Sequence, residues 1–91
     1  MKNQNFLGIS KDLLIDIIGQ IVRKTPGVDN TKKVNIDIEK KSSNLIVKVE
    51  FYPSEDIINI YDLCLRLQSL IHFQMTKHFD MKNINVEVTA L

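Results

Sequence analysis

The first strong pattern in the chain is a run of apolar residues at helical spacing between Ser10 and Pro26. Ser10 is a good N-cap, and Asp12 follows in the first turn, where the helix dipole favours an acid. Pro26 and Gly27 are expected to end the helix, because proline disfavours a helical residue before it and glycine permits a positive φ. The apolar positions of this amphipathic helix are Leu13, Leu14, Ile17, Ile18, Ile21 and Val22.

Three later runs alternate between apolar and polar residues, which is the pattern of a half-buried strand. They cover residues 34–39, 45–52 and 84–89. A polar turn at residues 40–44 separates the first two runs, so these two are predicted to form a hairpin. Between the hairpin and the last run, Pro53 and Ser54 are expected to open a second helix that continues to about residue 78.

The resulting order, α-β-β-α-β, predicts a single α+β domain of two layers, with two helices packed on one face of a three-stranded mixed sheet. A helix joins the second strand to the last, so these two strands should be parallel. Placing the last strand beside the first gives the order 2-1-3, with the 34–39 strand in the middle. Residues 1–8 are expected to be a loose N-terminal segment, and residues 9–91 to form the domain.

Length and composition narrow the class of protein. Ninety-one residues are enough for one core without disulfides or a metal, and a single cysteine, Cys64, excludes an internal disulfide. The net charge of +1 provides no overall field that would attract DNA or an acidic membrane. Neither a signal peptide nor a spanning helix is predicted, so we expect a cytoplasmic protein without direct membrane insertion, associated with a membrane only through a partner.

Several motifs occur in an order shared with a known family. They are the junction Thr25-Pro26-Gly27-Val28, the hairpin ending at Tyr52, the Leu67-Gln68 step, Met75-Thr76 and the closing run Ile84-Asn85-Val86-Glu87-Val88. On these motifs the chain resembles, over roughly residues 9–89, the alkaline shock protein family of bacterial envelope-stress proteins. Pro53 and Lys77 depart from that pattern, because the family usually has glycine at both places.

The resemblance implies a small cytoplasmic, non-enzymatic protein that a partner, such as a membrane-anchored protein, gathers near the membrane. It transfers no functional residue, because all the motifs that match are structural.

Catalytic residues, cofactor-binding residues and metal ligands are not expected. His72 and His78 are six residues apart, which places them on different helix faces rather than at the i,i+4 spacing of a metal pair. Cys64 lies among apolar residues and is expected in the core, with a raised pKa and low reactivity. Asp62 and Asp80 have no evident carboxylate partner for acid–base chemistry.

Nucleic-acid binding is weighed as the alternative function, because KH-type RNA-binding domains are small α/β modules of this kind. The three glycines of the chain cannot form the GXXG loop that such a domain uses. The open face of the sheet should be acidic and repel phosphate, with Asp37, Glu39, Glu50 and Glu87 against Lys48. The alternative is therefore a small RNA- or ribosome-associated module that uses a basic rim at one end of the first strand, formed by Arg23, Lys24, Lys32 and Lys33.

The favoured hypothesis rests on an excess of apolar helix surface. The apolar arc of the first helix spans roughly 200°, whereas a surface helix needs about 100°. The second helix places apolar residues on its polar side. We therefore predict that this apolar surface either packs between the two helices or contacts a protein partner or a second copy of the chain. We expect no DNA partner, and an RNA partner is less favoured than a protein. The predicted interface consists of Ile15, Ile18, Gly19, Val22, Ile58, Leu65 and Phe73.

Overall fold

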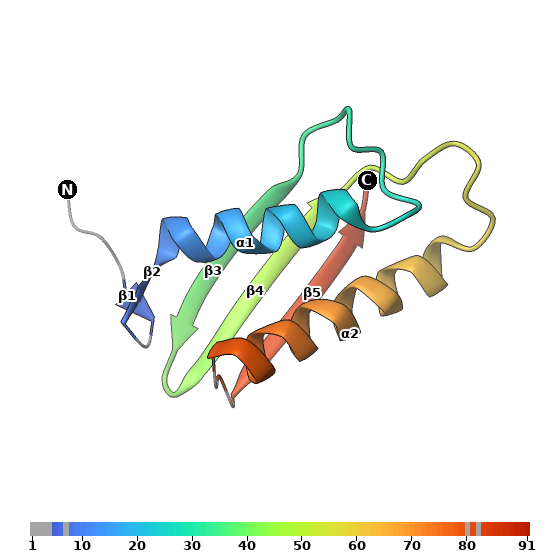
Figure 1. Cartoon of the computed structure of the whole chain (residues 1–91). Coiled ribbons are helices and arrows are strands. Elements are labelled where there is room, and N and C mark those ends of the chain that lie inside the picture. Colours follow the sequence, from blue (N-terminus) through green and yellow to red (C-terminus); the bar gives the residue numbers. More distant parts are fainter. Residues whose placement is uncertain (1–4, 7, 80, 82) are drawn as a thin grey trace.

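The computed structural model describes residues 5–6, 8–79, 81 and 83–91 as two helices packed on one face of a three-stranded sheet (Figure 1). This confirms the predicted α+β class, its two layers and its mixed sheet. The elements are β1 (Asn5–Phe6), β2 (Ile9–Ser10), α1 (Lys11–Lys24), β3 (Asn35–Lys41), β4 (Asn44–Phe51), α2 (Ile60–Phe79) and β5 (Ile84–Ala90).

The N-terminal segment that was expected to be loose lies largely outside the described residues. Within it, β1 pairs antiparallel with β2, in the register Asn5 with Ser10 and Phe6 with Ile9. This short pair leads directly into α1.

Helix α1 begins and ends where the sequence predicts. The side chain of Ser10 accepts a hydrogen bond from the backbone N–H of Leu13, at 3.2 Å. At the other end, the backbone N–H of Thr25 donates to Val22 O and its hydroxyl donates to Ile21 O, at 2.7 Å. Both ends are therefore capped by side chains of the flanking residues, which satisfies backbone groups that the helix leaves open.

Helix α2 begins later than predicted. It starts at Ile60, with the Asn59 side chain accepting a hydrogen bond from the backbone N–H of Asp62 at 2.9 Å, whereas the sequence suggested a start at Ser54. Instead of a first helical turn, residues 54–57 form a tight turn, in which the backbone N–H of Ile57 donates to Ser54 O at 3.2 Å, and the backbone N–H of Ser54 donates to Gly27 O at 2.8 Å. This bond ties the chain after β4 to the junction after α1, and the following residues make a turn before the helix starts.

The strand order of the sheet is β3-β4-β5, with β3 antiparallel and β5 parallel to β4. The hairpin and the parallel pairing of its second strand with the last strand are thus confirmed. The structure corrects the predicted order 2-1-3, because β4 rather than the 34–39 strand lies in the middle.

Burial explains why β4 is central. Its inward row, Leu45, Val47, Val49 and Phe51, is buried along its whole length. The inward row of β3 ends in the exposed Lys40, a residue type that natural proteins place on edge strands. The crossover through α2 also returns the chain beside the strand it left, which places β5 next to β4.

The core lies between the sheet and the two helices. Helix α2 contributes a row spaced four residues apart, and all four of its side chains are at most 2 % exposed: Leu63, Leu67, Ile71 and Met75. Helix α1 contributes a second row with the same spacing, all fully buried: Leu14, Ile18 and Val22. In the described part of the chain, neither helix combines the length and apolarity that crossing a membrane requires.

Candidate protein-interaction surface

One flank of α1 that was predicted to be an exposed apolar shoulder is part of the core. Ile18 and Val22 are fully buried, Gly19 is buried and Ile15 is half-buried. A Cβ at Gly19 would lie 3.5 Å from Ile36 Cδ1 on β3, so this flank packs closely against the sheet. The prediction that Ile18, Gly19 and Val22 lie on an exposed interface is therefore wrong.

The opposite flank of α1 is more exposed. Leu13, Ile17 and Ile21 form a row at i, i+4 and i+8. Leu13 is 50 % exposed, and the other two are half-buried. Since Gly19 marks the β3 side of the helix, this row faces toward α2. These residues were predicted as apolar positions of the amphipathic helix and not as part of the interface.

Helix α2 exposes apolar side chains away from the sheet. Phe73 is 52 % exposed, and Lys77 Nζ lies 5.2 Å from the centre of its ring. Leu65 is 43 % exposed, as its position on the polar side predicts. Ile58 is fully exposed, but it lies in the loop before α2 rather than on the helix. Ile60 and Tyr61, which were not among the predicted interface residues, are also exposed at the start of α2.

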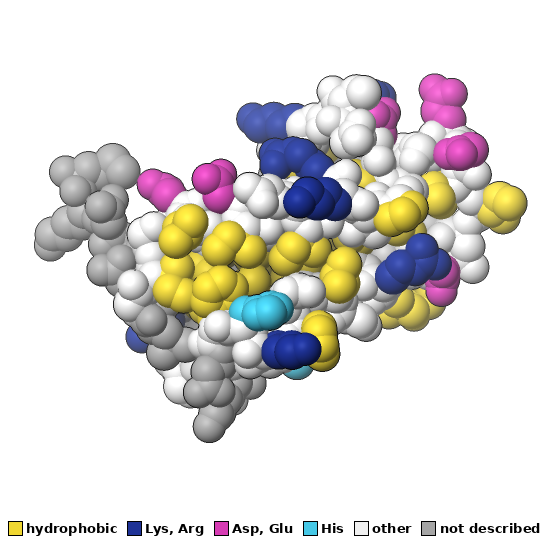
Figure 2. Space-filling model, viewed as in Figure 1, with side chains coloured by type: hydrophobic (Ala, Val, Ile, Leu, Met, Phe, Trp, Pro, Cys, Tyr) yellow, Lys and Arg dark blue, Asp and Glu magenta, His cyan; other side chains and the backbone are white. Residues whose placement is uncertain are grey.

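Exposed apolar side chains gather between α1 and α2 on the outer side of the helix layer, with polar side chains among them (Figure 2). Helix α2 packs mainly on β5 and contacts α1 little. The Gln68 side chain donates to Val86 O of β5, at 3.0 Å, so Leu70 and Phe73 lie on the flank of α2 toward α1. We call this surface the interhelix band and define it by Leu13, Ile17, Ile21, Leu70 and Phe73.

The predicted basic rim is present as a group of exposed residues. Arg23 and Lys24 end α1, and Lys32 and Lys33 lie in the loop before β3. Figure 2 shows dark blue side chains gathered above the C-terminal half of α1. Lys32 Nζ lies 5.0 Å from the centre of the Tyr52 ring, which partly engages this charge.

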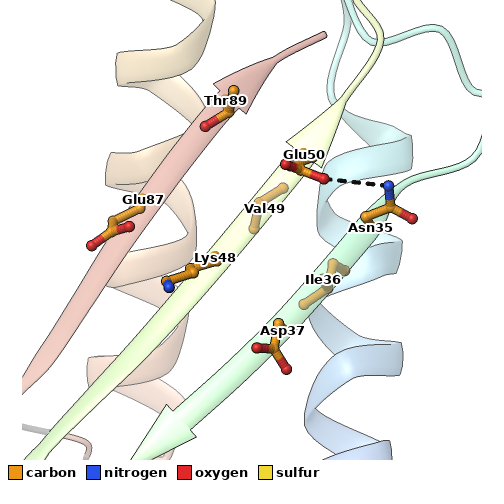
Figure 3. Close-up of a pocket in the computed structure, with 8 residues that line it drawn as sticks. All are labelled: Asn35, Ile36, Asp37, Lys48, Val49, Glu50, Glu87 and Thr89. Carbon is orange, nitrogen blue, oxygen red and sulfur yellow. Dashed lines mark hydrogen bonds between the residues drawn. The ribbon is translucent and has the colours of Figure 1, made fainter. Parts of the chain in front are cut away.

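The open face of the sheet is polar and acidic, as predicted (Figure 3). A shallow hollow of about 260 Å³ lies there, lined in part by Asp37, Glu50 and Glu87. Lys11 pairs with Asp37 at 3.4 Å, Lys48 pairs with Glu39 at 3.3 Å, and Asn35 donates to Glu50 at 3.4 Å. Several acids on this face are thus paired with their neighbours, and the remaining negative charge disfavours phosphate.

The residues considered for catalysis do not come together. His72 and His78 are both exposed, and Asp62 pairs with Arg66 on the same helix, at 2.8 Å. Asp80 lies outside the described residues. Among the residues that the structure describes, no three His, Cys, Asp or Glu side chains are grouped as metal ligands.

Two titratable groups have shifted pKa values for local reasons. Hydrogen bonds from the side chain and the backbone N–H of Thr31 lower the pKa of the Asp29 carboxyl. Burial raises the pKa of the half-buried Cys64 thiol, and a hydrogen bond from the backbone N–H of Ala90 to the sulfur offsets this only in part. Cys64 packs against the core from its edge rather than from its centre.

Cys64 should therefore react slowly with thiol reagents. Because the thiolate is the nucleophile, a raised pKa lowers the reactive fraction at neutral pH and moves the rate increase to higher pH. We expect the reaction with a disulfide reagent such as DTNB, followed from pH 6 to 10, to reach half its maximal rate at a higher pH than in a short cysteine peptide. A midpoint at or below that of the peptide would contradict the raised pKa.

No family model, curated protein or solved structure matches the chain.

Proposed function

We propose that the protein is a non-enzymatic binding or scaffolding module that contacts a protein through the interhelix band. The observation that supports this is the group of exposed apolar side chains on the outer side of the helix layer (Figure 2). Clustered exposed apolar side chains on a soluble domain commonly mark an interaction site. The open sheet face, by contrast, is polar and contains ion pairs and a hydrogen bond between its own side chains.

The band exposes two side chains that could anchor an interface. A phenylalanine side chain buries about 150–250 Å², so the exposed half of Phe73 amounts to roughly 100 Å². At about 25 cal/mol per Å², its burial contributes about 2.5 kcal/mol to an interface. Leu13, which is also half exposed, adds a smaller amount at the same end of the layer. Two such anchors resemble the few side chains that dominate typical protein interfaces.

The cellular context of the proposal comes from the sequence motifs. Their resemblance to alkaline shock proteins suggests a role in cell-envelope stress or homeostasis, in the cytoplasm and near the membrane through an anchored partner. The band is the surface that such a partner, or another copy of the chain, would bind.

Site-specific photocrosslinking tests the proposal. We expect p-benzoylphenylalanine in place of Phe73 to form a protein adduct on irradiation of cells that express the protein, because this side chain would lie inside the interface. The matched control carries the same crosslinker in place of Glu87, an exposed residue on the open sheet face. Adducts of equal yield from both positions, or none from the Phe73 position, would refute the proposed function.

A further inference from the structure

Each of the two helices has an acidic residue toward its start and a basic residue toward its end, and these charges flank the interhelix band. Helix α1 has the exposed Asp16 in its first half and the exposed Lys24 at its end. Helix α2 likewise has Asp62 in its first turn and Lys77 in its last turn. Since α1 and α2 run in opposite directions (Figure 1), Asp16 lies at the same end of the layer as Lys77, and Lys24 at the same end as Asp62.

These charges do not pair across the band within one chain. Among the described residues, the ion pairs are Lys11–Asp37, Lys48–Glu39 and Arg66–Asp62. Asp16, Lys24 and Lys77 are thus left with their charges facing solvent beside an apolar surface. A partner that covers the band would have to present charges opposite to those of Asp16, Lys24 and Lys77.

We propose that the partner is a second copy of this chain, bound face to face through the helix layer. This inference rests on the proposed function and names its partner. A two-fold axis along the interhelix band places α1 of each copy over α2 of the other, in the opposite direction. Asp16 of one copy then faces Lys77 of the other, and Lys24 faces Asp62. Because the contact is isologous, each of these pairs occurs twice.

The same operation brings the apolar residues together. Leu13 and Ile17 lie in the first half of α1, and Phe73 lies in the second half of α2, so they occupy the same end of the layer. The axis therefore places Leu13 and Ile17 of one copy near Phe73 of the other. Lys77, whose charge lies over the Phe73 ring, would seal the edge of this contact with its alkyl stem.

The helix layer is large enough for a dimer. At 1.5 Å per residue, the 14 residues of α1 extend about 21 Å and the 20 residues of α2 about 30 Å. Two helices side by side are about 20 Å wide, so the flat projection of the layer is roughly 500 Å². Protruding side chains raise the accessible area above this projection, toward the roughly 800 Å² per partner of a standard interface. A standard interface of about 800 Å² per partner would cover about 13 % of the total accessible surface of 6139 Å².

Charge reversal on separate chains tests the dimer. In Asp16→Lys, two lysines face each other at both symmetry-related contacts, and in Lys77→Asp two aspartates do. We expect each variant alone to self-associate about 10-fold more weakly than the wild type, or worse, in sedimentation equilibrium at low salt. An equimolar mixture of the two variants should regain the wild-type affinity, because both contacts then join opposite charges.

The mixing step separates contacts between chains from contacts within one chain, which mixing cannot restore. Glu87→Lys on the open sheet face changes the charge by the same amount as Asp16→Lys and should leave association unchanged. A wild-type chain that stays monomeric at about 100 μM, or a mixture that stays as weak as its components, overturns the dimer. Adducts from the Phe73 position whose mass is not that of two chains would refute the dimer and keep the proposed function, whereas no adduct at all refutes both.

Discussion

Replacing Gly27 by alanine should lower the free energy of unfolding by about 2–4 kcal/mol. Two costs add up at this position. Gly27 has a φ of 101°, a conformation that residues with a side chain rarely adopt. A Cβ there would also lie 2.7 Å from Ile57 Cδ1 and 3.2 Å from Leu63 Cδ2, so the packing between the junction and α2 must shift. Urea denaturation followed by circular dichroism measures the loss.

Gly8→Ala is the matched control for this prediction. Gly8 also has a positive φ, of 80°, but an added Cβ would meet no atom within 4 Å. Its substitution should therefore cost only the backbone strain, about 1–2 kcal/mol. If Gly27→Ala and Gly8→Ala destabilise the protein equally, the close approach of Ile57 and Leu63 to the junction contributes nothing.

Ile18→Ala should destabilise the fold by about 2–5 kcal/mol, whereas Ile58→Ala should change the free energy of unfolding by less than about 0.5 kcal/mol. Both residues belong to the interface that the sequence predicts, and both substitutions remove the same atoms. Ile18 is fully buried between α1 and the sheet, so its truncation leaves a cavity. Ile58 is fully exposed in the loop before α2, so its truncation leaves none.

The same denaturation experiment tests both variants. The comparison reports directly whether Ile18 belongs to the core or to an open surface. Comparable small effects for the two substitutions would mean that α1 does not bury the row of Leu14, Ile18 and Val22, and the assignment of the band to the opposite flank would then fall with it.

The junction after α1 explains several features of the structure together. The turn from Thr25 to Val28 is closed by a backbone hydrogen bond, with proline and then glycine at its two central positions. Gly27 O accepts from Ser54 N–H, and Asp29 N–H donates to Tyr52 O, both at 2.8 Å. These two bonds join the end of α1 to the end of β4. The motif therefore holds the end of α1 on the sheet. Through the position of α1, it also determines where the interhelix band lies.

The charges along the helices, as well as the apolar area of the band, favour a second copy of the chain as the partner. An apolar band alone would suit many partners, because burial is not directional. The acid-to-base order along both α1 and α2 makes the layer complementary to itself under a two-fold rotation. This order also suits the dipole of each helix, so the same residues support helix stability and define the proposed partner.

The spacing of apolar residues along the chain was enough to predict the extent of α1, all three strands of the sheet, the acidic open face and the layer arrangement. These features depend on local periodicity and on nearby capping groups such as Ser10, which act within a few residues. The exposure of Phe73 and Leu65 followed from the same spacing, because they stand among polar residues on the outer side of α2.

Contacts between distant segments decided the rest. Residues 54–57 form a turn bonded to Gly27 where the sequence suggested the first turn of α2, and the continuous burial of β4 places that strand in the middle of the sheet. The docking angle of α1 buries Ile18 and leaves Leu13 half exposed, although both belong to one broad apolar arc. Periodicity specifies how wide an apolar surface is, but only the packing of one element against another determines which part of it remains open to a partner.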